Sequence, residues 1–234
     1  MNTITLAGVE ALSMVGRLDP TLVEIVALSL RVSLASVALS AALALPIGAL
    51  VAVAAFPGRR AAVVVLNALL GLPAVVVGLA VYLLLSRAGP LGALGILFTP
   101  SAMIVAQAIL VFPLLAALTR QVVADAYTET REQLVSLGAS TWTSALALLV
   151  DVRYTLATIL LAGFGRAISE VGAVMIVGGN IDGVTRVMTT AIALETSKGD
   201  LPLALGLGFV LLAIVLALNV VASMVKDGAQ RRHG

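Results

Sequence analysis

The chain has 234 residues, of which 61% are hydrophobic and 11% are charged, and its mean hydropathy is +1.14. A soluble domain carries about 25% charged residues, so this chain lacks the polar surface that a water-soluble globule needs, and we expect an integral membrane protein. It has no cysteine and a single histidine, His233, which excludes disulfides, thiol catalysis and histidine-based metal centres. The net charge of +2 gives no indication of nucleic-acid binding.

Five stretches are long and apolar enough to cross a hydrocarbon core about 30 Å thick, which takes roughly 20 helical residues. They are Val32–Ala55, Ala61–Leu85, Ser101–Thr119, Thr155–Gly178 and Leu203–Val225. Barrel strands are shorter, about 10 residues, and alternate in polarity. The sequence therefore predicts an all-α bundle of about five transmembrane helices, with residues 32–225 as the membrane domain.

The segments outside these spans are predicted in less detail. Residues 1–31 form an external or interfacial segment in which Thr21–Leu30 lies flat on the membrane, and they lack the basic start of a cleavable signal. Thr185–Ser197 has the pattern of a short amphipathic helix, and residues 226–234 form a polar tail.

Lysine and arginine predict the orientation, because cytoplasmic loops are enriched in both. Eight basic residues fall on one side of the predicted spans and five on the other. The richer side has Arg59, Arg60, Arg120, Arg131, Arg153, Lys226, Arg231 and Arg232; the poorer side has Arg17, Arg31, Arg87, Arg186 and Lys198. We therefore expect the N-terminus outside, and the C-terminus and the 120–154 connection in the cytoplasm.

The 120–154 connection is a polar interlude of mixed charge between two apolar stretches. It holds Asp125, Glu129, Arg131 and Glu132 before Leu137-Gly138-Ala139-Ser140. The following run, Trp142–Val150, also fits the start of a longer span, but Asp151 and Arg153 would each cost about 2.5–3.5 kcal/mol at a membrane centre. We interpret it as a helix on the cytoplasmic surface, and the whole interlude as a platform for a partner.

The fourth predicted span contains charged residues, whose presence inside a membrane needs an explanation. Arg166 and Glu170 lie four residues apart near the middle of the predicted span, so both fall on one helical face with Ser169. One interpretation is an ion pair within the helix that neutralises both charges. The other is a water-accessible path, because ionisable groups inside membranes usually face a cavity or the bundle interior. Both are compatible, and we expect Arg166, Ser169, Glu170 and Gly172 to organise a translocation path or its gate.

Small residues and prolines recur along the predicted spans. Ser36, Ser40, Ala44 and Gly48 are four residues apart, a spacing that allows close helix–helix approach, most simply within the chain. Pro46, Pro73 and Pro113 fall in three different spans, where each is expected to kink its helix.

Two motifs resemble a known family, the permease subunits of binding-protein-dependent ABC importers. Glu132-Gln133-Leu134 followed by Gly138 is similar to the E-A-A-x-x-x-G loop of these permeases, with Gln133-Leu134 in place of two alanines and Asp151 in place of a later proline. The run from Gly165 to Ala173, with Gly178-Gly179-Asn180-Ile181 and Thr185, resembles the pattern of the sulfate/molybdate branch and most of all that of tungstate-type permeases. Ser169 departs from the usual glycine.

The resemblance implies a homodimer in a prokaryotic inner membrane, docked on two ABC ATPase subunits that bind ATP and Mg²⁺, and supplied by an extracytoplasmic solute-binding protein. A short coupling helix near Ser136–Trp142 would hold the ATPase. The docking residues implied are Glu132, Leu134, Leu137, Gly138, Ala139, Ser140 and Trp142. This chain itself has no G-x-x-x-x-G-K-[ST] phosphate loop, so no cofactor and no catalytic role is expected for it.

Three alternatives stay open at this point. The first is a permease of the same architecture for molybdate, sulfate or another solute. The second is a secondary transporter or channel that works without ATP. The third, a structural membrane anchor, does not explain Arg166 and Glu170.

Overall fold

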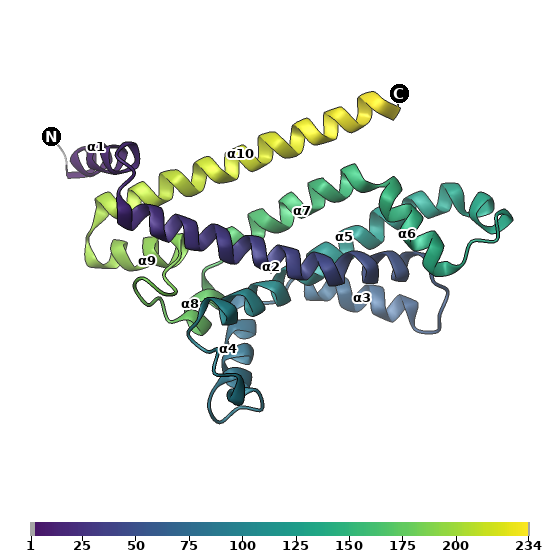
Figure 1. Ribbon diagram of the computed structural model, residues 1–234, viewed down its shortest axis with the longest axis horizontal. Helices are drawn as coiled ribbons and strands as arrows, with labels where there is room; N and C mark the ends of the chain where they lie inside the picture. Colours follow the sequence, from purple (N-terminus) through teal and green to yellow (C-terminus); the bar gives the residue numbers. More distant parts are fainter. Residues whose placement is uncertain (1–2, 234) are drawn as a thin grey trace. The chain divides into compact units, whose positions relative to one another are not determined.

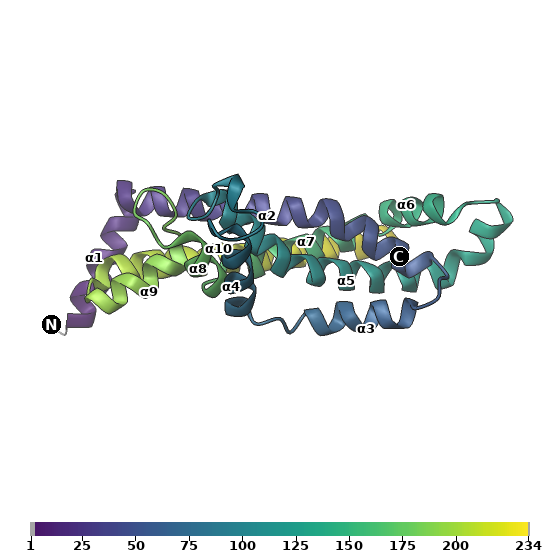
Figure 2. The ribbon, with the colours of Figure 1, turned by 90° about the horizontal axis from the view of Figure 1, so that it is seen from below.

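The computed structural model describes residues 3–233, and the side chains of residues 5–224, as a helical protein (Figures 1 and 2). The described elements, in chain order, are α1 (Thr3–Gly16), α2 (Pro20–Val53), α3 (Arg59–Leu69), α4 (Ala74–Leu85), the 3₁₀ helix η1 (Gly92–Leu94), α5 (Pro100–Ser136), α6 (Thr141–Asp151), α7 (Arg153–Ile168), α8 (Gly172–Gly178), α9 (Met188–Lys198) and α10 (Leu201–His233). The predicted all-α class is confirmed.

Three helices of the described chain, α2, α5 and α10, are long and apolar enough to cross a membrane alone. Two bent pairs, α3 with α4 and α6 with α7, raise the number to five if each pair is one span. The helices α9 and α6 match the predicted amphipathic helix and surface helix to within a few residues. The prediction of about five spans therefore agrees with the upper number.

Several predicted boundaries are wrong. Ala61–Leu85 is not one helix, because α3 and α4 meet at a bend of 101° and Pro73 lies at the start of α4 rather than inside a helix. Thr155–Gly178 is broken as well, since α7 ends at Ile168 and α8 begins at Gly172. Thr21–Leu30 does not form a separate helix lying flat, because α2 runs without a break from Pro20.

The chain divides into two compact units. The first unit comprises residues 1–35, 73–107 and 167–218, and the second comprises residues 36–72, 108–166 and 219–234. The division expected from the sequence, into an external segment (residues 1–31), a membrane domain (residues 32–225) and a tail (residues 226–234), describes placement relative to the membrane. That placement stays a prediction.

In the first unit, α4 packs against α8 at a glycine. A Cβ atom added at Gly78 would lie 2.7 Å from the Cα of Ala173 and 3.2 Å from its carbonyl oxygen. Real side chains do not approach backbone so closely, so the two helices can be this near only because residue 78 lacks a side chain. The carboxylate of Glu170, just before α8, accepts hydrogen bonds from the N–H groups of Val171 and Ala173 at 3.1 and 3.4 Å.

This contact predicts that Gly78→Ala destabilises the protein by about 1–3 kcal/mol, the usual cost of overpacking a well-packed contact. The measurement is the thermal unfolding midpoint of the purified protein in detergent. Gly165→Ala is the matched control, because nothing lies within 4 Å of a Cβ atom added there, and alanine is the better helix former. Equal midpoints for the two variants would contradict the close packing of α4 on α8.

In the second unit, α2 and α5 meet along the small residues of α2. Ser36, Ser40, Ala44 and Gly48 are all buried, and the hydroxyl of Ser40 donates a 2.6 Å hydrogen bond to the carbonyl oxygen of Ala108. A Cβ atom at Gly48 would lie 2.6 Å from the carbonyl oxygen of Ala116. The seam predicted from four-residue spacing is confirmed as packing within the chain, and Pro46 and Pro113 lie inside the two helices that form it.

Candidate functional site: the α5–α6 projection and the α7–α8 break

The helix α5 continues well past the apolar stretch that starts it. With 37 residues it is about 55 Å long at 1.5 Å per residue, longer than the hydrocarbon core. Its last turns carry the charged residues of the polar interlude, and they end at Ser136. We call Glu132–Trp142, where α5 ends and α6 begins, the α5–α6 projection.

Gly138 ends α5 in a specific way. Its φ is +72°. The N–H of Gly138 donates to the carbonyl oxygen of Val135 at 2.9 Å, and the N–H of Ala139 donates to the carbonyl oxygen of Leu134 at 3.0 Å. This pair of bonds is the Schellman motif, in which a left-handed residue after the helix closes its last turn. Ser136–Trp142, expected to hold a short coupling helix, therefore forms the junction between two helices rather than a helix of its own.

Ser140 begins the next helix. Its hydroxyl oxygen accepts a hydrogen bond from the N–H of Thr143 at 3.1 Å, the N-cap arrangement that satisfies a free donor of the first turn. The inner face of α6 then packs through Ala145 and Leu148 on Ala52 of α2 and Val123 of α5. The projection is therefore held by hydrogen bonds at its turn and by an apolar cluster at its base.

The projection and the turn before it expose large apolar side chains among polar ones. Leu137 is 82% exposed and Trp142 is 52% exposed, with Val135 beside them at 63%. Leu134 instead turns inward and packs on the cluster under α6. Two large apolar side chains exposed beside a hydrogen-bonded turn are a typical anchor for a partner's groove.

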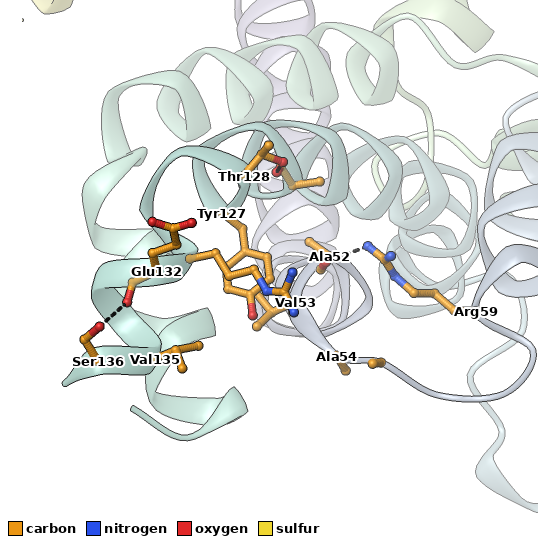
Figure 3. A pocket seen from close by; sticks show the side chains of 12 residues that line it. Ala52, Val53, Ala54, Arg59, Tyr127, Thr128, Glu132, Val135 and Ser136 are labelled. Carbon is orange, nitrogen blue, oxygen red and sulfur yellow. Dashed lines mark hydrogen bonds between the residues drawn. The ribbon is translucent and has the colours of Figure 1, made fainter. Parts of the chain in front are cut away.

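A cavity of about 900 Å³ lies beside the projection (Figure 3). One wall is the face of α5 that carries Tyr127, Thr128 and Glu132, and the other is the end of α2 with Arg59. Arg59 donates to the carbonyl oxygens of Val51 and Ala52 at 2.8 and 2.6 Å, so it closes the C-terminus of α2 and fixes this wall. Sequence reasoning missed the cavity, whose walls lie some 70 residues apart in the chain.

The predicted path or gate around Arg166 and Glu170 has a different structure from the one expected. Because α7 ends at Ile168, Arg166 and Glu170 do not lie in one continuous helix, and the single helical face expected for them is wrong. Arg166 is the last residue of its stretch of the second unit and is exposed, whereas Glu170 in the first unit is only 5% exposed.

Glu170 instead organises the break that precedes α8. Besides accepting the hydrogen bonds from Val171 and Ala173, it accepts one at its carbonyl oxygen from the hydroxyl of Thr189, at 2.7 Å. Gly172 packs closely there, since a Cβ atom added to it would lie 2.9 Å from Val75 Cγ2 and would require that side chain to shift. Ser169 is exposed. The structure thus brings Ser169, Glu170 and Gly172 together in one turn, and Thr189 is a member that the sequence did not reveal.

Comparison with known proteins gives the chain its family. No family model matches it. Over 91% of its length it is 44% identical to a probable anion ABC transporter permease protein of Haloferax volcanii, covering 94% of that protein. It is 43% identical to the tungstate uptake system permease protein TupB of Peptoclostridium acidaminophilum (93% of this chain, 95% of the relative) and 36% identical to TupB of Campylobacter jejuni (73% and 72%). Relatives of this kind are membrane-embedded, non-catalytic permease subunits, and the chain belongs to their family, the ABC transporter permeases that include the tungstate uptake permeases.

Proposed function

We propose that two copies of this chain form the path by which tungstate enters the cell, driven by a separate ATPase and supplied by an extracytoplasmic binding protein. The observation that carries the proposal is the 43% identity, over 93% of the chain, to a tungstate uptake permease. The motifs agree with it: Glu132–Gly138 resembles the loop of ABC importer permeases in general, and Gly165–Ala173 resembles the pattern of the tungstate-type branch.

The division of roles follows from the two sites. The α5–α6 projection is the handle for the ATPase, since Leu137 and Trp142 stand exposed on a rigid base. The turn around Glu170, together with Arg166, organises the path or its gate. A dianion is too costly to leave in hydrocarbon, so the path is a water-lined cavity that opens transiently as ATP binding moves the two handles.

Reconstitution tests the function directly. Proteoliposomes containing this chain, its ATPase and the tungstate-binding protein should accumulate tungstate, measured as tungsten by mass spectrometry, only when ATP is present on the ATPase side. Competing molybdate and sulfate separate the substrate alternatives. Uptake without any ATPase would replace the proposal by a secondary transporter or a channel, and uptake of sulfate in preference to tungstate would change the substrate.

The docking assignment predicts the effect of Gly138→Asp. Nothing lies within 4 Å of an added Cβ atom at this position, and aspartate tolerates a positive φ better than most residues, so the variant should fold. Its carboxylate would be buried without a partner in the interface, a cost of several kcal/mol, so capture of the ATPase on the tagged permease should be lost. Gly138→Asn has the same shape without the charge and should still bind the ATPase. If both variants fail to bind the ATPase, the cause is the changed backbone at position 138 and not the buried charge.

A further inference from the structure

The cavity of about 900 Å³ beside the α5–α6 projection has no part in the roles proposed above. We call it the α2–α5 cavity. All of its lining residues belong to the second unit. Its polar lining comprises two arginines, one carboxylate and three hydroxyl groups: Arg59, Arg131, Glu132, Tyr127, Thr128 and Ser136.

Three hydrogen-bond donors in this lining have no acceptor among the described residues. Arg59 uses its Nε and Nη2 on the carbonyl oxygens of Val51 and Ala52, which fixes the guanidinium and leaves Nη1 without an acceptor there. Arg131 is exposed and makes no ion pair or hydrogen bond with another described residue, and neither does the hydroxyl of Tyr127. The cavity therefore offers donors of both kinds, charged and neutral.

The one carboxylate of the lining does not neutralise these arginines. Glu132 makes no ion pair with any described residue, and Figure 3 shows its carboxylate well away from Arg59. The hydroxyl groups of Thr128 and Ser136 donate to main-chain carbonyl oxygens of α5, at 2.9 and 2.7 Å. Two positive charges thus stand against one negative charge, and the cavity favours an anion.

The α2 wall of the cavity lies where an apolar stretch of the sequence ends. Residues 52–55 are the last of the first predicted span, and Arg59 and Arg60 follow closely. A change from apolar to basic residues marks the boundary between hydrocarbon and water, and tyrosine is enriched at the same level. Tyr127 of the opposite wall fits this position. Lipid phosphates lie at that boundary, so they can reach the cavity from within the membrane.

The lining distinguishes between kinds of occupant. An apolar ligand would strip water from Arg131 and Glu132 without replacing their interactions. A free tetrahedral anion would use the arginines but leave the apolar lining, Ala52–Ala55 with Ala124 and Val135, without contact. An anionic phospholipid satisfies both parts, because its phosphate accepts charge-assisted hydrogen bonds while its glycerol and acyl chains cover apolar side chains. Exposed apolar side chains follow in the α2–α3 turn and in α3: Phe56, Val64 and Val65.

We propose that the α2–α5 cavity binds the phosphate group of an anionic phospholipid, taken from the membrane leaflet on the side of the α5–α6 projection. Arg131, the Nη1 of Arg59 and the hydroxyl of Tyr127 are the donors. Basic pockets between membrane helices bind lipid headgroups in this way. The inference goes beyond the proposed function, since it depends on neither the transported substrate nor the ATPase. A bound lipid would join the end of α2 to α5 at the base of the projection.

Arg131→Gln tests the site by removing one unpaired charge from an exposed side chain. The probe is phosphatidylglycerol added to the purified permease in detergent, and the bound lipid is counted by native mass spectrometry. We expect its affinity to fall about fivefold, the contribution of one basic residue beside an anionic lipid, and to fall less in Tyr127→Phe. Arg60→Gln is the matched control, because Arg60 is also exposed but does not line the cavity, and its lipid binding should be unchanged.

Thermal unfolding separates a lipid from a free anion. A ligand that binds only the folded protein raises the unfolding midpoint, so phosphatidylglycerol should raise that of the unaltered permease and raise it less in Arg131→Gln. Phosphatidylcholine, inorganic phosphate and tungstate should each have little effect. If phosphate or tungstate raises the midpoint as much as phosphatidylglycerol does, the cavity binds a free oxyanion and the lipid assignment is wrong.

A single thiol gives a measurement inside a membrane. The chain has no cysteine, so Ala55→Cys places one thiol in the cavity lining and Ala61→Cys places one outside it, both at exposed positions. In nanodiscs that contain phosphatidylglycerol, the thiol at position 55 should react with an uncharged maleimide several-fold more slowly than in nanodiscs of phosphatidylcholine alone. The thiol at position 61 should react at the same rate in both.

Two results would overturn the lipid site. Equal loss of phosphatidylglycerol in Arg131→Gln and Arg60→Gln would mean that the lipid is attracted by the basic surface as a whole. Equal reaction rates at position 55 in the two kinds of nanodisc would mean that no anionic lipid occupies the cavity in a membrane.

Discussion

Replacing both Leu137 and Trp142 with alanine is expected to abolish association with the ATPase while leaving the permease folded. Leu137 is 82% exposed and Trp142 is 52% exposed, and neither belongs to the buried cluster under α6, so their removal leaves that cluster intact. Central apolar anchors of an interface cost about 2 kcal/mol or more each when truncated, and together they would weaken binding roughly a thousandfold or more, since each 1.4 kcal/mol is tenfold. The measurement is co-purification of the ATPase, followed by nucleotide-driven uptake in proteoliposomes.

Two further variants sharpen this test. Leu146→Ala/Val150→Ala removes two other exposed apolar side chains, 43% and 63% exposed, from α6 beyond the projection, and should leave the ATPase bound. Leu148→Ala instead removes a buried side chain under α6, which is 3% exposed, and should lower the thermal unfolding midpoint. Normal ATPase binding by the Leu137/Trp142 variant would mean that the handle lies elsewhere on the chain.

The sequence predicts this projection well because its signals are local. Glycine at position 138 favours a left-handed turn, Ser140 is a preferred N-cap, and the charged residues before them cannot lie in hydrocarbon. The seam of Ser36, Ser40, Ala44 and Gly48 was predictable for the same reason, since its spacing alone indicates close approach. The cavity beside the projection was not, because it depends on where the end of α2 lies against α5.

The helix breaks show why hydropathy alone misplaces spans. The residues between α3 and α4, Leu70–Pro73, differ little in hydropathy from those on either side, so only Gly71 and Pro73 indicate an interruption. At Ser169–Val171 the spacing of Arg166 and Glu170 even favours a continuous helix. Two contacts hold the break there: the tertiary packing of α8 on α4 at Gly78, and the local hydrogen bonds of Glu170 to the N–H groups of Val171 and Ala173.

Two substitutions of Glu170 are expected to separate its structural role from the role of its charge. Glu170→Gln keeps the oxygen that accepts from the N–H groups of Val171 and Ala173, so α8 should stay in place. Glu170→Ala leaves these donors without their acceptor, at about 1–3 kcal/mol each if they remain buried, and opens a small cavity. We therefore expect ATP-driven tungstate uptake to persist in Glu170→Gln and to be lost in Glu170→Ala, with a lower unfolding midpoint.

Arg166 provides the complementary test of the path. Because its side chain is exposed and α7 ends only two residues later, Arg166→Ala should fold and still bind the ATPase, yet transport the dianion at least tenfold more slowly. Arg166→Lys retains the positive charge and should therefore restore much of the transport rate. If Arg166 served only a structural role, restoring the charge would not be enough to restore transport. If Arg166→Ala and Glu170→Ala both transport tungstate normally, this turn does not organise the path, and the gate must be sought among other residues of the two units.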